Sequence, residues 1–106
     1  MPNVARVGDL INTGHGCDAT ATISNAGASN VYANGKLLAL QGTAINPHTI
    51  TNPSTAPGAP PCIGHTGQVI IGSSSTVRAN GRFVARVGDS ADLGSITEGS
   101  ANVFAN

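Results

Sequence analysis

Residues 76–88 read TVRANGRFVARVG and residues 30–42 read NVYANGKLLALQG, so the two stretches align without a gap. In each stretch an Asn-Gly pair separates two short runs that contain β-branched, aromatic or leucine side chains. This pattern predicts a β-hairpin, because both residues of the pair tolerate the positive φ angles that a two-residue turn requires. We therefore expect hairpins centred on residues 34–35 and 80–81.

The same unit recurs in part at both ends of the chain. Residues 102–106 (NVFAN) repeat its first half, and residues 4–9 (VARVGD) repeat its second half. The chain is thus a permuted set of three units, and three stacked hairpins with small side chains would share one narrow core. We expect an all-β fold, conical and pseudo-threefold. Little or no helix is expected, since no window holds a 3.6-residue apolar period over ten or more residues.

The composition indicates one small domain, residues 1–106, with a modest core. Only 3% of the residues are aromatic, 9% are charged and there is no Trp. The net charge is zero and the arginines are scattered without interleaved aromatic residues, which argues against nucleic-acid binding. No apolar run is long enough to span a bilayer, and the N-terminus lacks the features of a signal peptide.

One stretch breaks the repeat, an insertion at about residues 46–65. Its first part, residues 46–61, is rich in proline. Proline clusters are typical of loops, so we expect a loop rather than a strand here. A loop of this length usually serves a function or is tied down by other contacts.

The histidines and cysteines all lie between the predicted hairpins. Cys62 and His65 have a spacing that a tight turn can wrap around one ion, and tetrahedral Zn²⁺ takes four nitrogen or sulfur ligands. We predict one structural metal site made by His15, His48, Cys62 and His65, with Cys17 as the rival sulfur ligand. A site with two cysteines and two histidines is also compatible. Zn²⁺ is the expected ion, and Fe²⁺ suits such ligands as well.

Disulfide formation and catalysis are the competing interpretations of these residues. Two cysteines allow at most one disulfide, and in a chain without a secretory signal, thiols beside histidines favour metal ligation. Cys17 with His15 as its base would make a nucleophile, but no third orienting group is evident. Asp9 and Asp89 occupy equivalent repeat positions after a glycine, which indicates turn capping. We expect no enzymatic activity and no catalytic residues.

In residues 4–9 and 83–89 the sequence resembles the PAAR-repeat family, named for a Pro-Ala-Ala-Arg motif before a Gly-Asp turn. Spaced Gly-Ser, Asn-Val-x-x-Asn-Gly and Ala-Arg-x-Gly-Asp elements extend the resemblance over essentially the whole chain, together with the His-Gly-Cys at residues 15–17. The resemblance implies a cone of hairpins with a metal near its point. Its base would sit on the blunt end of a trimeric β-helical spike, VgrG or a phage tail counterpart.

The same resemblance implies roles for individual residues. His15 matches the first family ligand, the pair Cys62 and His65 matches a later one, and His48 fits members with a longer loop. Residues 91–94 (ADLG) lack the Cys-Gly that many members carry after the last turn. That difference shifts the expected sulfur ligand to Cys62 or Cys17.

The function expected from the resemblance is a non-enzymatic tip protein, bound as one copy per spike trimer. It would sharpen the spike of a phage tail or a type VI secretion machine and touch the target membrane transiently. Its location would be the virion tail tip, or outside the cell after secretion with the injection apparatus. The alternatives are a metal-containing adaptor that recruits effectors to the spike and, less favoured, a small zinc hydrolase. Since the sequence ends at Asn106 just after the third partial repeat, we expect a bare tip without an appended toxin domain.

Overall fold

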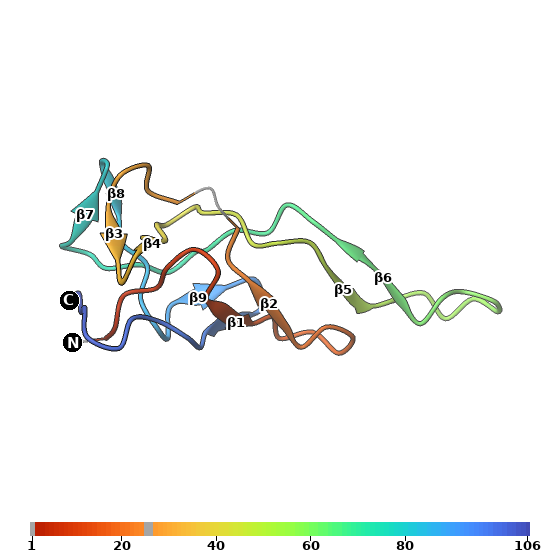
Figure 1. Cartoon of the computed structure of the whole chain (residues 1–106). Helices are drawn as coiled ribbons and strands as arrows, with labels where there is room; N and C mark the ends of the chain where they lie inside the picture. The colour runs from red at the N-terminus through yellow and green to blue at the C-terminus, as the bar shows by residue number, and fades with distance from the viewer. Residues whose placement is uncertain (1, 25–26) are drawn as a thin grey trace.

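The computed structural model describes residues 2–24 and 27–106, and this part of the chain is all-β with no helix (Figure 1). The all-β prediction is confirmed. No helix that could cross a membrane occurs among these residues. The strands are β1 Leu10–Asn12, β2 Thr20–Thr22, β3 Tyr32–Ala33, β4 Lys36–Leu37, β5 His48–Thr51, β6 Cys62–His65, β7 Arg78–Ala79, β8 Arg82–Phe83, β9 Ser90–Ala91 and β10 Gly94–Ile96.

The two predicted Asn-Gly hairpins are present. β3 pairs antiparallel with β4, and β7 pairs antiparallel with β8. Asn34 and Gly35 have φ angles of 54° and 79°, and Asn80 and Gly81 have φ angles of 51° and 80°. These are the left-handed conformations that Asn and Gly adopt most readily, so the turn sequence specifies the hairpin.

The third unit is closed by the two ends of the chain, as the permuted repeat predicts. The Val4 N–H donates to the Val103 carbonyl at 2.9 Å, and Asn3 forms a β-bridge with Phe104. The equivalent bonds inside the other units run from Leu38 to Val31 and from Val84 to Val77. The termini therefore lie side by side, at the left end of Figure 1.

The three units are joined by a closed ring of backbone hydrogen bonds around three alanines. The Ala5 N–H donates to the Ala85 carbonyl at 2.9 Å, Ala85 donates to Ala39 at 3.0 Å, and Ala39 donates to Ala5 at 3.0 Å. All three side chains are fully buried. A methyl group is the largest side chain that three strands can share so close to one axis, which explains alanine at each position.

A second set of equivalent contacts follows each strand of the ring. In each unit a glycine N–H donates to an isoleucine carbonyl of a neighbouring segment at 2.8–2.9 Å: Gly8 to Ile23, Gly42 to Ile70 and Gly88 to Ile96. The turn that contains each glycine is capped by the buried side chain of the next residue, which accepts a backbone N–H from the start of the turn. Asp9 accepts from Arg6 at 2.8 Å, Asp89 from Arg86 at 2.7 Å, and Thr43 from Leu40 at 3.0 Å. The turn-capping prediction for the two aspartates is confirmed.

The core consists of small and branched side chains in two clusters. One contains the three ring alanines with Ile11, Ile23, Ile45, Ile70, Ala91 and Ile96, and the other contains Val4, Ala28, Ala33, Leu38, Leu40, Ala79, Val84 and Ala105. No aromatic side chain belongs to either cluster. Stability from burial is therefore concentrated where the three units meet.

A four-stranded antiparallel sheet, in the order β2-β1-β10-β9, forms the middle of the molecule. Asn12 at the end of β1 pairs with Ser95 near the start of β10, and with Thr20 at the start of β2. This register brings the β1–β2 loop, residues 13–19, and the β9–β10 turn, residues 92–93, to the same end of the sheet. Residues far apart in the sequence are thereby placed together.

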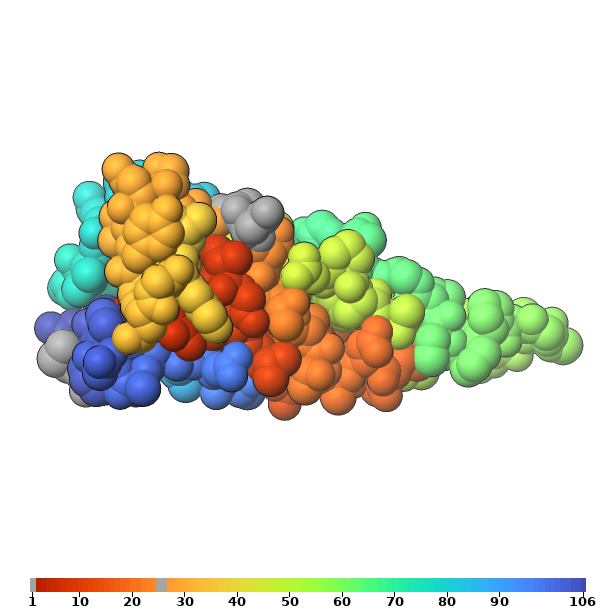
Figure 2. All heavy atoms as spheres, viewed as in Figure 1, coloured from red at the N-terminus to blue at the C-terminus, as the bar shows by residue number. Residues whose placement is uncertain are grey.

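The molecule is elongated and tapers toward β5 and β6 (Figure 2). Its principal extents are 49 × 23 × 22 Å. We call β5, β6 and the connecting residues 52–61 the tip hairpin, and the rest of the described chain the body. The broad end of the body, made by β3–β4, β7–β8 and the paired chain ends, is the base. The tip hairpin corrects a prediction: residues 48–51 of the expected loop form a strand, which pairs with residues 62–65 of the same insertion. The prolines of residues 46–61 all lie outside the two strands, so the pairing between β5 and β6 keeps its N–H donors.

Candidate metal centre

Four side chains converge where the tip hairpin leaves the body. His15 lies in the β1–β2 loop, His48 begins β5, His65 ends β6, and Asp92 lies in the β9–β10 turn. His48 and His65 are direct cross-strand partners. One donor atom from each side chain lies within 4.8 Å of all the others. We call these four residues the cluster.

The turn that carries Asp92 fixes the direction of its carboxylate. Asp92 has φ = 55°, a left-handed conformation that Asp adopts more readily than most residues. Its Oδ1 is 3.0 Å from His15 Nε2, and its Oδ2 is 2.7 Å from His48 Nε2 and 3.5 Å from His65 Nδ1. One carboxylate therefore contacts all three histidines.

The loop that carries His15 is held by close backbone packing. Gly14 has φ = 76°, and a Cβ atom added there would lie 2.6 Å from the Leu93 carbonyl oxygen. The Leu93 N–H in turn donates to the Thr13 carbonyl at 3.1 Å. Only glycine permits this approach of the loop to the turn beside Asp92. The positions of two cluster residues are thus coupled through the backbone.

The hydrogen bonds of His48 determine which of its ring nitrogens faces the cluster. His48 Nδ1 is 3.0 Å from the Asn46 carbonyl oxygen, which can only accept, so Nδ1 carries a proton. Nε2 therefore faces the cluster, 2.7 Å from Asp92 Oδ2 and 3.2 Å from His65 Nδ1. It can donate to the carboxylate when it is protonated, or act as a ligand of a cation bound between the two when it is not.

The cluster is largely buried. The Asp92 side chain is 2% exposed and that of His48 is 3% exposed, whereas those of His15 and His65 are 13% and 21% exposed. Burial raises the pKa of Asp92, but hydrogen bonds with His15 and His48 and the charges of His15 and His65 outweigh it, so that its pKa lies below the ordinary value. This lowered pKa favours the carboxylate form of Asp92, which could serve as an anionic ligand.

The residues fit a transition-metal ion. Tetrahedral Zn²⁺ with nitrogen and oxygen ligands at about 2.0–2.2 Å separates its ligand atoms by about 3.3–3.6 Å. In the cluster, the closest donor pairs, counting both oxygens of Asp92, are 2.7–3.5 Å apart, and one donor atom from each residue lies within 4.8 Å of the others. The bond from His48 Nδ1 to a backbone carbonyl is also the outer contact that typically orients a metal-binding imidazole. The cluster is a candidate metal centre with three nitrogen donors and one oxygen donor.

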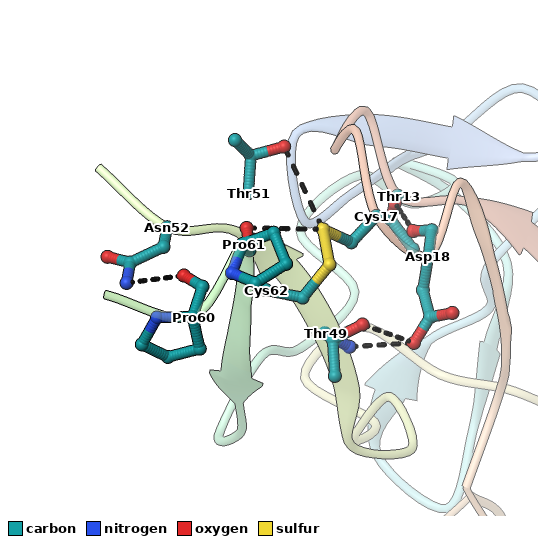
Figure 3. Close-up of a disulfide and its surroundings, with 9 residues drawn as sticks. All are labelled: Thr13, Cys17, Asp18, Thr49, Thr51, Asn52, Pro60, Pro61 and Cys62. Atoms are coloured by element: carbon teal, nitrogen blue, oxygen red, sulfur yellow. Dashed lines mark hydrogen bonds between the residues drawn. A yellow bond between two sulfur atoms is a disulfide. The ribbon is translucent and has the colours of Figure 1, made fainter. Parts of the chain in front are cut away.

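The predicted sulfur ligand is corrected by the structure. Cys17 and Cys62 are joined to each other in a disulfide (Figure 3), so neither supplies a thiolate to the cluster. The three predicted histidines do come together, and Asp92 stands where a cysteine was expected. The same disulfide removes Cys17 as a nucleophile. The sequence could not distinguish these outcomes, because both thiols lie beside histidines in either case.

The disulfide lies on the outer side of the cluster, toward the loop of the tip hairpin. Cys62 pairs across the hairpin with Thr51, the last residue of β5, whereas His48 pairs with His65 at the other end. Figure 3 shows Cys17 beside Thr51 and Pro61; its Sγ is 3.7 Å from the Pro61 carbonyl oxygen. The cluster and the disulfide are thus successive connections between the β1–β2 loop and the tip hairpin.

A third connection joins the same two segments. The Asp18 carboxylate accepts the Thr49 N–H at 2.8 Å and the Thr49 hydroxyl at 2.9 Å, and the Asp18 N–H donates to the Thr49 carbonyl at 3.0 Å (Figure 3). The bonds from the Thr49 backbone and hydroxyl lower the pKa of Asp18 below its ordinary value. Thr49 follows His48, so this contact also positions a cluster residue.

Sequence reasoning missed Asp92, although one signal pointed to its position. Residues 91–94 are the stretch in which the PAAR resemblance expects a late cysteine, and Asp92 lies within it. Because a carboxylate is an ordinary zinc ligand, Asp92 could have been recognised as a replacement for the missing late cysteine.

Comparison with known proteins adds no assignment. No protein-family model matches the chain, and the search of curated proteins finds no match either.

Proposed function

We propose that this chain is a non-enzymatic tip protein that caps the trimeric β-helical spike of a contractile injection apparatus, as one copy per trimer. The observation that carries the proposal is the closed hydrogen-bond ring through Ala5, Ala39 and Ala85. A single chain with three equivalent edges can present the same contact to each subunit of a threefold partner. The PAAR-like repeat motifs support the same function.

The base supplies a suitable contact surface. Tyr32, Arg78 and Phe104 occupy equivalent repeat positions, and all three are exposed. Tyr32 is 61% exposed and Phe104 is 48% exposed, although aromatic side chains are otherwise rare in this chain. Aromatic and arginine side chains are enriched at the centres of protein interfaces. We infer that the spike binds here, at the broad end of a conical, pseudo-threefold body.

The narrow end suits contact with a target membrane. Residues 52–61, the outermost part of the tip hairpin, contain no charged side chain, so none has to be desolvated when this segment meets an apolar surface. The tip hairpin contributes no residue to the buried aliphatic clusters. The disulfide, the four-residue cluster and the Asp18–Thr49 contact hold it to the body instead. A narrow end held in this way resists bending when it is pushed against a membrane.

The cluster, in this proposal, holds one structural transition-metal ion through His15, His48, His65 and Asp92. Zn²⁺ is the expected ion, and Fe²⁺ also accepts three imidazoles and a carboxylate. Such an ion would add its binding free energy to folding, because the ligands come together only in the folded chain. The burial of Asp92 and His48 favours a structural over a catalytic role.

Elemental analysis tests the metal. We expect about one zinc or iron per chain in the purified protein, lost in His48→Ala. A protein with less than a tenth of an equivalent of any transition metal, and no uptake when zinc is added, would contradict the proposed metal and leave the spike proposal to be tested by binding.

The stoichiometry of binding tests the tip. The chain is mixed with the spike trimer of a contractile particle from the same source, and the mass of the complex is measured. We expect one chain per trimer, and loss of binding when Tyr32→Asp and Phe104→Asp are combined at the base. Thr55→Asp, at another exposed position in the tip hairpin, is the control and should bind normally. Three chains per trimer, or equal loss in the control, would contradict the proposal.

A further inference from the structure

The disulfide and the cluster connect the same two segments of the chain. Cys17 lies two residues after His15 in the β1–β2 loop, and Cys62 lies three residues before His65 in β6. Both connections therefore close nearly the same long loop, since the two cysteines are 45 residues apart in sequence. Formation of either connection therefore also brings together the residues that make the other.

Loop closure makes the two connections cooperative. Bringing the ends of a loop together costs conformational entropy, and the cost is incurred once, by whichever connection forms first. With the disulfide closed, His15 already lies beside His48 and His65, so a metal ion binds a preorganised site. With the metal bound, the two sulfur atoms are held close, which favours the disulfide over two free thiols.

The disulfide is also placed where a reductant reaches it. Cys62 is exposed and Cys17 is half-buried, in contrast to the buried carboxylate of Asp92. A small dithiol can transfer two electrons and two protons to the Cys17 Sγ–Cys62 Sγ bond, leaving two thiols on the chain and one cyclic disulfide on the reductant. Asp18 and Thr49 would then be the remaining link between the two segments besides the cluster.

We propose that the Cys17–Cys62 disulfide sets the metal affinity of the His15, His48, His65 and Asp92 cluster, so that reduction of the disulfide loosens the metal. The coupling is reciprocal by thermodynamic necessity, so the metal makes the disulfide harder to reduce by the same factor. Entry into a reducing compartment would then weaken both cross-links of the tip hairpin together. The inference rests on the metal site proposed above.

The direct test is competition for Zn²⁺ between a chelator of known affinity and three proteins at neutral pH: the oxidised chain, the chain reduced with a dithiol that is then removed under anaerobic conditions, and the double variant Cys17→Ser, Cys62→Ser. We expect reduction to weaken Zn²⁺ binding about 5–150-fold, the usual range of coupling between two sites. The double variant should match the reduced chain, because both lack the cross-link. Equal affinity in the oxidised and reduced chains would overturn the inference.

Cobalt spectra exclude the opposite arrangement, in which freed thiols become ligands. Co²⁺ bound to the reduced chain should show no thiolate-to-cobalt charge-transfer band, because Asp92 remains the fourth donor. A strong band in the reduced chain, absent in the double variant, would overturn the inference by showing that sulfur replaces the carboxylate. Retention of the ring and base in both proteins is checked by the hydrogen exchange of their amides.

The reverse experiment measures the disulfide. The chain is equilibrated with mixtures of reduced and oxidised glutathione, with and without Zn²⁺, and the fraction of disulfide is measured after acid quenching. Zn²⁺ should shift the midpoint toward more reducing mixtures by the factor found in the affinity measurement. No shift, in a chain that does bind Zn²⁺, would contradict the coupling. Absence of Zn²⁺ binding to both oxidised and reduced chains would instead remove the metal site itself.

Discussion

The body and the tip hairpin are stabilised by different interactions. In the body, three repeats share a closed ring of backbone hydrogen bonds and two clusters of buried aliphatic side chains. The tip hairpin contributes no residue to either cluster and is held by a disulfide, the four-residue cluster and the Asp18–Thr49 contact. The difference follows from shape, because a segment this narrow has too little volume to bury a core of its own.

Removing core volume is the most damaging change expected, and it should act on the whole molecule. Ile70 is 1% exposed and its neighbour Ile71 is 57% exposed, so Ile70→Ala and Ile71→Ala are a matched pair. We expect Ile70→Ala to lower the free energy of unfolding by about 2–5 kcal/mol. Ile71→Ala should lower it by less than about 0.5 kcal/mol. Urea unfolding measures both, and equal losses would contradict the assignment of the core.

Removing one cluster ligand should loosen only the tip hairpin. Loss of an outer-shell partner typically weakens metal binding about 10–100-fold, so loss of the Asp92 carboxylate should weaken it by at least about 100-fold. We expect this result for Asp92→Asn in a Zn²⁺ competition assay. Glu98→Gln makes the same kind of chemical change at a residue outside the cluster and serves as the control. An affinity unchanged in Asp92→Asn would show that this carboxylate is no ligand.

Removing one turn cap should weaken the body rather than the tip hairpin. The Thr43 hydroxyl is buried and accepts the Leu40 N–H, and Val preserves the shape of Thr without that oxygen. Thr43→Val should cost about 1–3 kcal/mol, because a buried N–H loses its acceptor. Thr97→Val is the control, since the Thr97 hydroxyl is exposed and water can replace its bond to Leu10. Urea unfolding that shows equal losses in the two variants would contradict the capping role.

The smallest effect is expected at Asp18, and it should depend on pH. The pKa of Asp18 is lowered by its bonds from Thr49, so the contact stabilises the fold above the pKa of an unfolded Asp, about 3.9, and this stabilisation is lost as the pH falls through the lower folded-state value. Thermal unfolding should show Asp18→Asn less stable than the natural chain at pH 7. The difference should shrink below about pH 4. A constant difference from pH 7 to pH 3 would show that the charge contributes nothing.

The sequence predicts more of the structure of the body than of the tip hairpin. Asn34-Gly35 and Asn80-Gly81 specify hairpins locally, and the repeated Ala-Arg-x-Gly-Asp pattern specifies the capped turns at Asp9 and Asp89. Strands β5 and β6 were missed because prolines dominate residues 46–61, yet all of them lie outside the paired strands. Turn motifs can predict the repeats because each hairpin and each capped turn is formed by residues close together in sequence.

The candidate site was predicted in part. His15, His48 and His65 converge as expected from their positions between repeats. The pairing of Cys17 with Cys62 and the part played by Asp92 depend on which residues the four-stranded sheet and the tip hairpin bring within a few ångströms, and spacing in the sequence does not determine those distances. The register of β1 against β10 supplies the missing information.

Hydrogen exchange tests the contrast between the two regions most directly. Amides of β5 and β6 and the ring amides of Ala5, Ala39 and Ala85 are followed in the metal-loaded, oxidised chain and again after addition of a chelator and a dithiol. We predict that exchange in β5 and β6 accelerates at least tenfold while exchange of the ring amides stays the same. Equal acceleration in both regions, or no acceleration in the tip hairpin, would contradict this contrast. The body would then not be held by burial alone, or the tip hairpin would not depend on its cross-links.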